Sequence, residues 1–243
     1  MLKDERFGKG TFTRRDALKI AGAAGVMAAL PWRGAKEAKA AAPALKGPQA
    51  GGYYRFAIGE IEAMVISDGD ISFQPIQPMW APEAAKVELE ALLRSSYLPT
   101  DRINLDVNTL LLKIGGELVL VDTGAGNLFG PTLGKMAERL AAAGVQPAQV
   151  TAVVISHAHP DHFGGLLDGA GKPVFPNAAY FASKTEVDYW TGPDPDLSKL
   201  RVPEESKKMF LDNARRYLGA VKGRLTPVSA GQKIVPGLEV VSA

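Results

Sequence analysis

Short apolar or alternating segments dominate the chain from about residue 53 to residue 73. Residues 54–58, 60–67 and 71–73 each have the length and pattern of a strand. The polar residues 67–70 separate the last two, and Gly69 there can adopt a positive φ. The pattern therefore predicts a meander of three strands, with a turn at residues 67–70.

A helix and a hairpin follow. Pro82 precedes the amphipathic segment 83–96, as expected of proline at the start of a helix. Residues 108–114 and 117–122 have strand patterns and are joined by two glycines, which predicts a hairpin. The second of these strands is apolar almost throughout, so we expect both of its faces to be buried under other elements.

The remaining pattern alternates between helices and strands. Residues 133–144 predict a helix that stops at Gly144, and residues 150–156 predict a second strand buried on both faces. Further expected elements are a strand at 179–183, helices at 184–190 and 204–218, and strands at 226–228 and 238–241. This order predicts an α/β (α+β) fold, a mixed sandwich of sheets with helices outside.

The first 42 residues have the order of an export signal. Arg14 and Arg15 precede an apolar run at 20–30, and alanines follow. The arginine pair resembles a twin-arginine signal, which predicts a periplasmic or secreted protein. An amphipathic helix with an incidental arginine pair is the alternative. Eleven apolar residues are too few for a stable membrane anchor. We expect a signal peptide at 1–42, a linker at 43–52 and a folded domain at 53–243.

Charge and cysteine content limit which partners and which metal ligands this chain can have. The chain has 243 residues and a formal charge of +2, but its first forty residues carry nine Lys and Arg against four Asp and Glu. The other 203 residues carry 19 basic and 22 acidic side chains, with no basic stripe for a nucleic-acid backbone. There is no cysteine, so disulfides and thiolate ligands are excluded and any metal must be held by nitrogen and oxygen.

All three histidines of the chain lie in one short segment, HAHPDH at 157–162. In extended backbone, residues two apart point the same way, so His157 and His159 can present nitrogens to one metal ion. Asp161 and His162 lie on the following turn and form a natural pair for a second ion. The alternative is a surface turn with solvated histidines, although four such donors within six positions are far denser than ordinary usage.

The segment matches the HxHxDH motif of the metallo-β-lactamase-fold hydrolases, and LVLVDTG at 118–124 matches the strand-end Asp motif of that superfamily. Within it, the chain resembles methyl parathion hydrolase and its relatives from residue 51 to 241, in the segments GGYYRFAIGEIEAMVISDG, VDTGAGNLFGPTLGKMAERLAAAGVQP and HPDHFGG. The resemblance implies an αββα sandwich and two divalent metal ions, zinc or similar. It also implies hydrolysis of phosphotriesters, lactones or aryl esters by a metal-bridging hydroxide.

The resemblance also assigns roles to residues. His157 and His159 would bind the first metal, Asp161 and His162 the second, and Asp122 would orient a ligand from outside the metal sphere. A turn residue at a strand end is the other interpretation of Asp122. Three aromatic residues are candidates for an apolar substrate pocket, with a place in the core as the alternative: Phe129, Trp190 and Phe210.

The superfamily completes its site with a later His, a bridging Asp and a final His, which the sequence given does not contain. We therefore expect this chain to be the N-terminal part of a periplasmic dinuclear hydrolase. The alternative is a non-catalytic metal-binding remnant. The expected partner is a small-molecule substrate, with no nucleic acid, and a homodimer is left open.

Overall fold

The computed structural model describes residues 42, 44–47 and 49–241. The expected signal peptide therefore lies outside the described residues, apart from Ala42. In the expected linker, Leu45 is buried and its backbone N–H donates to the Glu62 carboxylate at 2.6 Å. Among the described residues, no helix is long and apolar enough to cross a bilayer.

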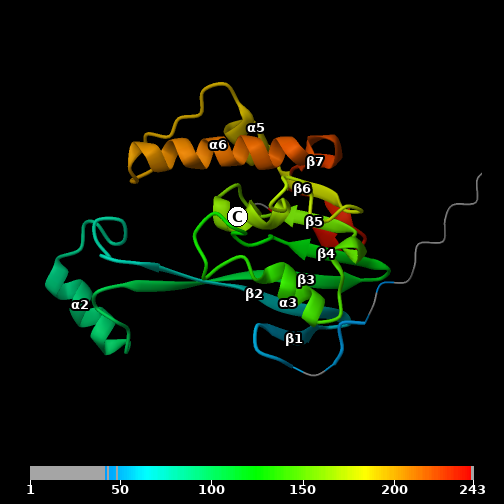
Figure 1. Ribbon diagram of the computed structural model, residues 1–243, viewed down its shortest axis with the longest axis horizontal. Helices are drawn as coiled ribbons and strands as arrows, with labels where there is room; N and C mark the ends of the chain where they lie inside the picture. Colours follow the sequence, from blue (N-terminus) through cyan, green and yellow to red (C-terminus); the bar gives the residue numbers. More distant parts are fainter. Residues whose placement is uncertain (1–41, 43, 48, 242–243) are drawn as a thin grey trace, which may run out of the picture. The chain divides into compact units, whose positions relative to one another are not determined.

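A seven-stranded sheet forms the centre of the domain (Figure 1). Its first four strands pair antiparallel, and the pairs from the fourth to the seventh strand are parallel. In spatial order the strands are β1 (Tyr53–Ile58), β2 (Ile61–Phe73), β3 (Ile103–Ile114), β4 (Glu117–Val121), β5 (Ala152–Ile155), β6 (Ala179–Ser183) and β7 (Leu225–Val228). The parallel strands end at the same edge, which positions the segments that follow β4 and β5 next to each other.

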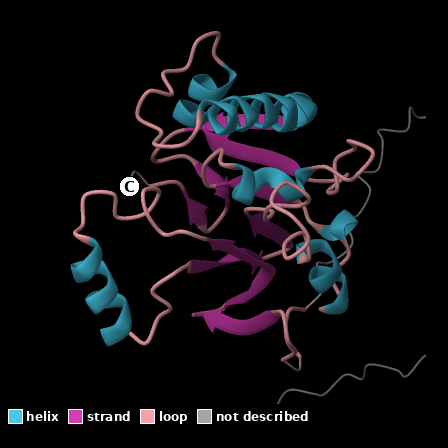
Figure 2. Ribbon diagram, turned by 60° about the vertical axis from the view of Figure 1, so that its left-hand side comes forward, coloured by secondary structure: helices cyan, strands magenta, loops and turns pink. Residues whose placement is uncertain are grey.

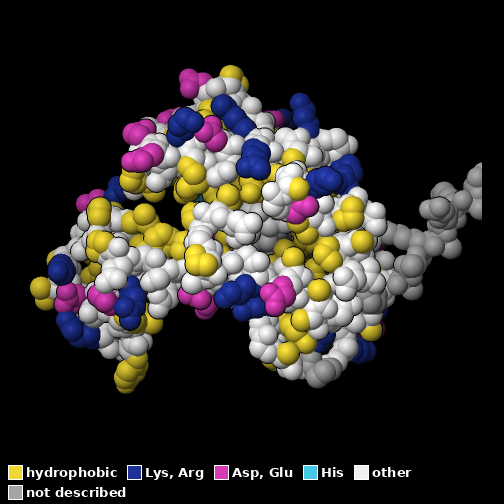
Figure 3. Space-filling model, in the orientation of Figure 1, with side chains coloured by type: hydrophobic (Ala, Val, Ile, Leu, Met, Phe, Trp, Pro, Cys, Tyr) yellow, Lys and Arg dark blue, Asp and Glu magenta, His cyan; other side chains and the backbone are white. Residues whose placement is uncertain are grey.

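Helices are the other main elements of the domain (Figure 2). They are α2 (Lys86–Ser95), α3 (Met136–Ala142), α4 (Pro160–Phe163), α5 (Lys184–Thr191) and α6 (Glu204–Val221). A hairpin of β8 (Lys233–Val235) and β9 (Leu238–Glu239) is separate from the main sheet. Val87 and Leu92 of α2, and Tyr97 just beyond its end, are exposed hydrophobic residues. Hydrophobic side chains are scattered over the face of the molecule shown in Figure 3.

Alternation along the strands divides the core between the two faces of the sheet. Leu118 and Leu120 of β4 pack with Met136 and Leu140 of α3 and with residues of α6 in the larger cluster. Val119, between them, belongs to a smaller cluster against which residues of the β8–β9 hairpin pack. The period of two thus gives one face covered by helices and one covered by a small hairpin. The predicted burial of both faces of β4 is confirmed.

The turn expected at residues 67–70 is wrong. β2 runs unbroken through these residues and pairs with β3, with a bulge between Ser67 and Gly69. Gly69 has the positive φ expected of it, +130°. The reason for the bulge is Asp68, the extra residue, whose buried carboxylate accepts hydrogen bonds from the loop before α3 and from the first residue of that helix.

Other boundaries also differ from the sequence pattern. The hairpin of β3 and β4 is confirmed, but β3 begins at Ile103, before the predicted residue 108. The strand expected at 238–241 is only Leu238–Glu239, and its partner β8 was not predicted. The mixed α/β fold class is confirmed. Among the described residues, the second layer of strands consists of β8 and β9.

Candidate functional site

The histidine segment lies between β5 and α4. β5 ends at Ile155, and α4 begins at Pro160, which occupies the first helical position. His159 is the N-cap residue, with extended φ and ψ of −92° and 150°. His157 and His159 therefore precede the helix, whereas Asp161 and His162 belong to it.

This local structure brings the four predicted ligand residues together. The ring centroids of His157 and His162 are 3.9 Å apart, and those of His157 and His159 are 4.6 Å apart. Asp161 lies on the same side, with its Oδ2 3.3 Å from His162 Nε2. Three imidazoles and a carboxylate thus meet at the edge where β5 ends.

Asp122 follows β4 and holds this cluster from the neighbouring strand. It is 8% exposed and its φ is +60°, in the left-handed region that is costly for a side chain other than glycine. Its carboxylate accepts from the N–H and hydroxyl of Ser156 at 2.8 and 2.7 Å, and lies 2.8 Å from His162 Nδ1. The backbone strain thus aims a buried carboxylate at a predicted ligand.

The backbone behind the cluster is closely packed. A Cβ on Gly164 would lie 2.0 Å from the carbonyl oxygen of Ala125, and one on Gly165 would lie 2.1 Å from that of Thr123. The N–H of Thr123 donates to the carbonyl of His162 at 2.7 Å. Only glycine allows the loop after β4 to approach α4 so closely, and this approach fixes Asp122 against His162.

The three histidines differ in their protonation. Burial, together with the neighbouring His162, lowers the pKa of His157 below 6.5, and burial lowers that of His159. Burial also acts to lower the pKa of His162, but hydrogen bonds to Asp122 and Asp161 outweigh it and raise that pKa to about 9. At neutral pH, His157 and His159 are therefore neutral, as metal ligands must be, and His162 is a cation between two carboxylates.

The donor chemistry fits a divalent ion such as zinc. Neutral imidazole nitrogens and carboxylate oxygens are its usual protein ligands when no thiolate is present. Within the part of the chain that the structure describes, however, no three His, Asp or Glu side chains are already arranged around one point as a metal site. One reason is that both ring nitrogens of His162 face carboxylates, so neither nitrogen points to a position shared with His157 and His159.

The predicted pocket residues lie in two places. Trp190, 3% exposed, and Phe210, partly buried, each have ring centroids 5.9 Å from that of His159. Phe129 packs instead with Val107 and Leu133 in a separate cluster. The structure thus brings two of the three aromatic residues to the histidines.

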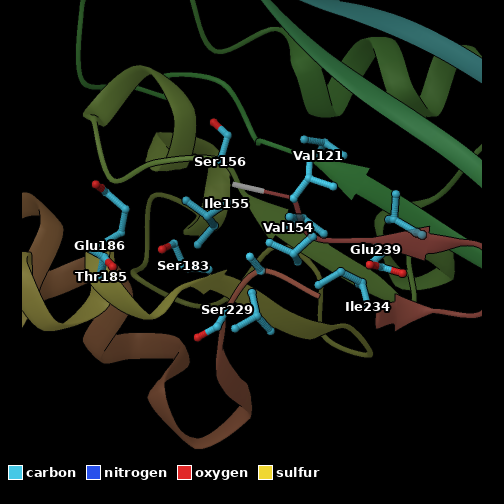
Figure 4. A pocket seen from close by; sticks show the side chains of 16 residues that line it. Val121, Val154, Ile155, Ser156, Ser183, Thr185, Glu186, Ser229, Ile234 and Glu239 are labelled. Carbon is cyan, nitrogen blue, oxygen red and sulfur yellow. The ribbon is translucent and has the colours of Figure 1, made fainter. Parts of the chain in front are cut away.

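A cavity of about 680 Å³ lies beside the cluster, between the sheet and the C-terminal hairpin. Val154 and Leu238 are among its apolar lining residues, and Ser156 and Glu186 are among the polar ones (Figure 4). The three histidines and the three predicted aromatic residues are not part of its lining. Ser156 connects the cavity to the cluster, since its hydroxyl lies 3.2 Å from His157 Nδ1.

Sequence reasoning missed two carboxylates that support this region. Asp68 lay in a segment whose Ser-Asp-Gly-Asp pattern indicates a turn. Glu186 lay within a predicted short helix at 184–190, where a glutamate is ordinary. The partners of Asp68 and the Ala158 partner of Glu186 are distant in sequence, so no local pattern could identify these contacts.

Residues 102–180 match the family model of the metallo-beta-lactamase superfamily. The matched residues include β3 to β5, Asp122 and the whole histidine segment. They cover about a third of the chain. A search of curated proteins found no match.

Solved structures resemble a larger part of the chain. AidC, described as a dizinc quorum-quenching lactonase in complex with the product N-hexanoyl-L-homoserine, is 29% identical with a TM-score of 0.70, over 76% of this chain and 64% of that one. The hydrolase AbOPH, of the beta lactamase superfamily, is 26% identical with a TM-score of 0.64, over 77% and 64%. The predicted metallo-β-lactamase fold is confirmed. The chain spans 64% of the length of each of these two proteins.

Proposed function

We propose that this chain is part of a metal-dependent hydrolase whose substrate is a lactone. The observation that carries the proposal is the convergence of His157, His159, Asp161 and His162, supported by Asp122, where parallel strands end. Ligands of α/β sheets commonly bind at this edge. The family match over these residues and the similarity to a lactonase support the same chemistry.

Each residue has a proposed role. His157 and His159 would hold one metal ion, and Asp161 with His162 would hold a second. Asp122 would orient His162 by accepting a hydrogen bond from its Nδ1, which leaves Nε2 as the ligand atom. When bound, two divalent ions lower the pKa of a water molecule and polarise the bond under attack. The dizinc description of AidC supports zinc and a count of two.

The choice of a lactone follows from the similarity to AidC. Phosphotriesters and aryl esters are further candidate substrates, proposed from the segments that resemble methyl parathion hydrolase. Trp190 and Phe210, which lie against His159, would give the metal site an apolar side suited to an acyl chain or an aryl group. Export through the twin-arginine signal also stays a proposal.

The test compares the zinc-loaded chain with the chelator-treated chain on N-hexanoyl-homoserine lactone, paraoxon and phenyl acetate. Because the four donors give each ion only two protein ligands, we expect little or no turnover by this chain alone. Once the later His and Asp residues of the superfamily are supplied, we expect ring opening of the lactone that requires zinc and is lost in His159→Ala, with Asp212→Asn on the exposed face of α6 as the control. Turnover that survives both the chelator and His159→Ala would contradict the proposal.

A second candidate function is metal binding without catalysis. The observation that favours it is that the described residues contain no closed set of three donors. Zinc bound at the histidines, together with no turnover of any of the three substrates even when the later His and Asp residues are supplied, would identify this function.

A further inference from the structure

One carboxylate oxygen of Glu186 on α5 connects two parts of the histidine site. Its Oε2 accepts the backbone N–H of Ala158 at 2.8 Å and the indole N–H of Trp190 at 3.0 Å. Ala158 is the residue between His157 and His159. The same oxygen therefore holds the backbone of the proposed first metal pair and a side chain that packs beside it.

Both donors need this acceptor. Ala158 is 1% exposed and Trp190 is 3% exposed, so neither N–H has ready access to water. A buried backbone or indole N–H without an acceptor is costly, and hydrogen bonds to a carboxylate are stronger than those to a neutral oxygen. The two bonds therefore fix the segment at 157–159 relative to α5.

Trp190 extends this effect to the His159 ring. The indole and the imidazole meet edge to face, with centroids 5.9 Å apart and an angle of 78° between the planes. Because Glu186 holds the indole nitrogen, it also fixes the surface against which His159 packs. No hydrogen bond joins Glu186 to an imidazole among those the structure describes. Its charge acts to raise the pKa of His159, and its positional influence passes through Ala158 and Trp190.

We propose that Glu186 is a positioning residue that sets His157 and His159 for metal binding, a role that rests on the proposed function. It is the counterpart of Asp122, which holds His162 from the loop directly after β4. Two carboxylates from different elements thus hold the two halves of the cluster: Asp122 by direct contact with an imidazole, Glu186 through the backbone between two of them.

The experiment measures zinc affinity of the full chain by competition with a chromogenic chelator. Outer partners of metal ligands typically contribute about 10–100-fold to affinity, and we expect a loss of this size in Glu186→Ala. Glu186→Gln should recover most of the affinity, because its amide oxygen can accept both N–H groups. Asp188→Ala is the matched control on the same helix, since Asp188 is exposed and pairs with Lys184, and it should bind zinc like the unaltered chain.

A second readout needs no metal. In the metal-free protein, hydrogen exchange of the Ala158 amide should accelerate in Glu186→Ala and return towards the original rate in Glu186→Gln. If Glu186→Ala does not fold, Glu186→Asp replaces it, because it keeps the charge but withdraws the carboxylate from Ala158. In Glu186→Asp we expect the same loss of zinc affinity and the same faster exchange of the Ala158 amide as in Glu186→Ala.

The outcomes separate the two proposals. A folded Glu186→Ala or Glu186→Asp variant with unchanged zinc affinity and unchanged Ala158 exchange overturns the positioning role and leaves the proposed function standing. Failure of the unaltered chain to bind zinc overturns the proposed function and, with it, the role of Glu186.

Discussion

At the scale of single residues, the three imidazoles of the cluster differ in charge at neutral pH. His157 and His159 are neutral because burial disfavours their charged forms. His162 is a cation because Asp122 and Asp161 face its two ring nitrogens. Zinc binding by His162 therefore requires this residue to release a proton, which links metal affinity to pH.

NMR titration of the metal-free chain can test this division directly, because the chain has only three histidines. We expect the pKa of His162 at about 9 and those of the other two below 6.5. Asp122→Asn should lower the pKa of His162, because it removes the negative charge that lies 2.8 Å from Nδ1. The control Asp212→Asn should leave the pKa of His162 unchanged. Three similar pKa values would contradict the geometry of the cluster.

The raised pKa of His162 also predicts how the free energy of unfolding changes with pH. The pKa of His162 is raised on folding, so its contribution to the free energy of unfolding is fully present below about 6.5 and is lost as pH rises through about 9. Urea unfolding of the metal-free chain should show a decline in this window that Asp122→Asn reduces. If the free energy of unfolding of Asp122→Asn declined with pH as steeply as that of the unaltered chain, the Asp122–His162 ion pair would not be its cause.

At the scale of elements, the bulge in β2 ties the sheet to the loop before α3. Asp68 is 1% exposed, and its carboxylate accepts the backbone N–H groups of Ala125, Gly134 and Met136 at 2.9, 3.0 and 2.9 Å. One side chain thus satisfies two amides of the loop that follows Asp122 and the first amide of α3. The bulge is therefore a support for the site as well as an irregularity of the strand.

Replacement of Asp68 by alanine leaves these amides without an acceptor. We expect the free energy of unfolding to fall by at least about 2 kcal/mol, since each unsatisfied buried group costs about 1–3 kcal/mol. Asp70→Ala is the control, because Asp70 lies two residues along the same strand and is exposed. Equal effects of the two substitutions in urea unfolding would show that the contacts of Asp68 do not stabilise the loop.

These elements show how far the sequence pattern predicts the fold. The β3–β4 hairpin and the burial of β4 follow from local apolar patterns, which the sequence displays directly. The bulge at Asp68 and the hydrogen bond from Ala158 to Glu186 depend on partners that are distant in sequence and meet only in the folded chain. From the local pattern alone, Asp68 therefore indicates a turn and Glu186 an ordinary helix position. The histidine cluster was predictable because its members are adjacent in sequence.

At the scale of the whole domain, one sheet has two differently covered faces, and the site lies at its edge. The face under α3 and α6 holds the larger apolar cluster, and the other packs against β8 and β9 beside the cavity. Asp122 and the histidines follow adjacent parallel strands, so their meeting is a consequence of strand order. That order could not be obtained from the local pattern alone, although the resemblance to the metallo-β-lactamase fold implied that Asp122 lies close to the histidines.

The central claim is that His157, His159, Asp161 and His162 bind metal. Anomalous diffraction at the zinc absorption edge from crystals of the zinc-loaded chain tests it most directly. The account predicts one maximum of anomalous density within bonding distance of imidazole nitrogens of His157 and His159, about 2 Å, and a second beside Asp161 and His162. Zinc density found only at other places on the chain, or none at the histidines at full zinc loading, would contradict it.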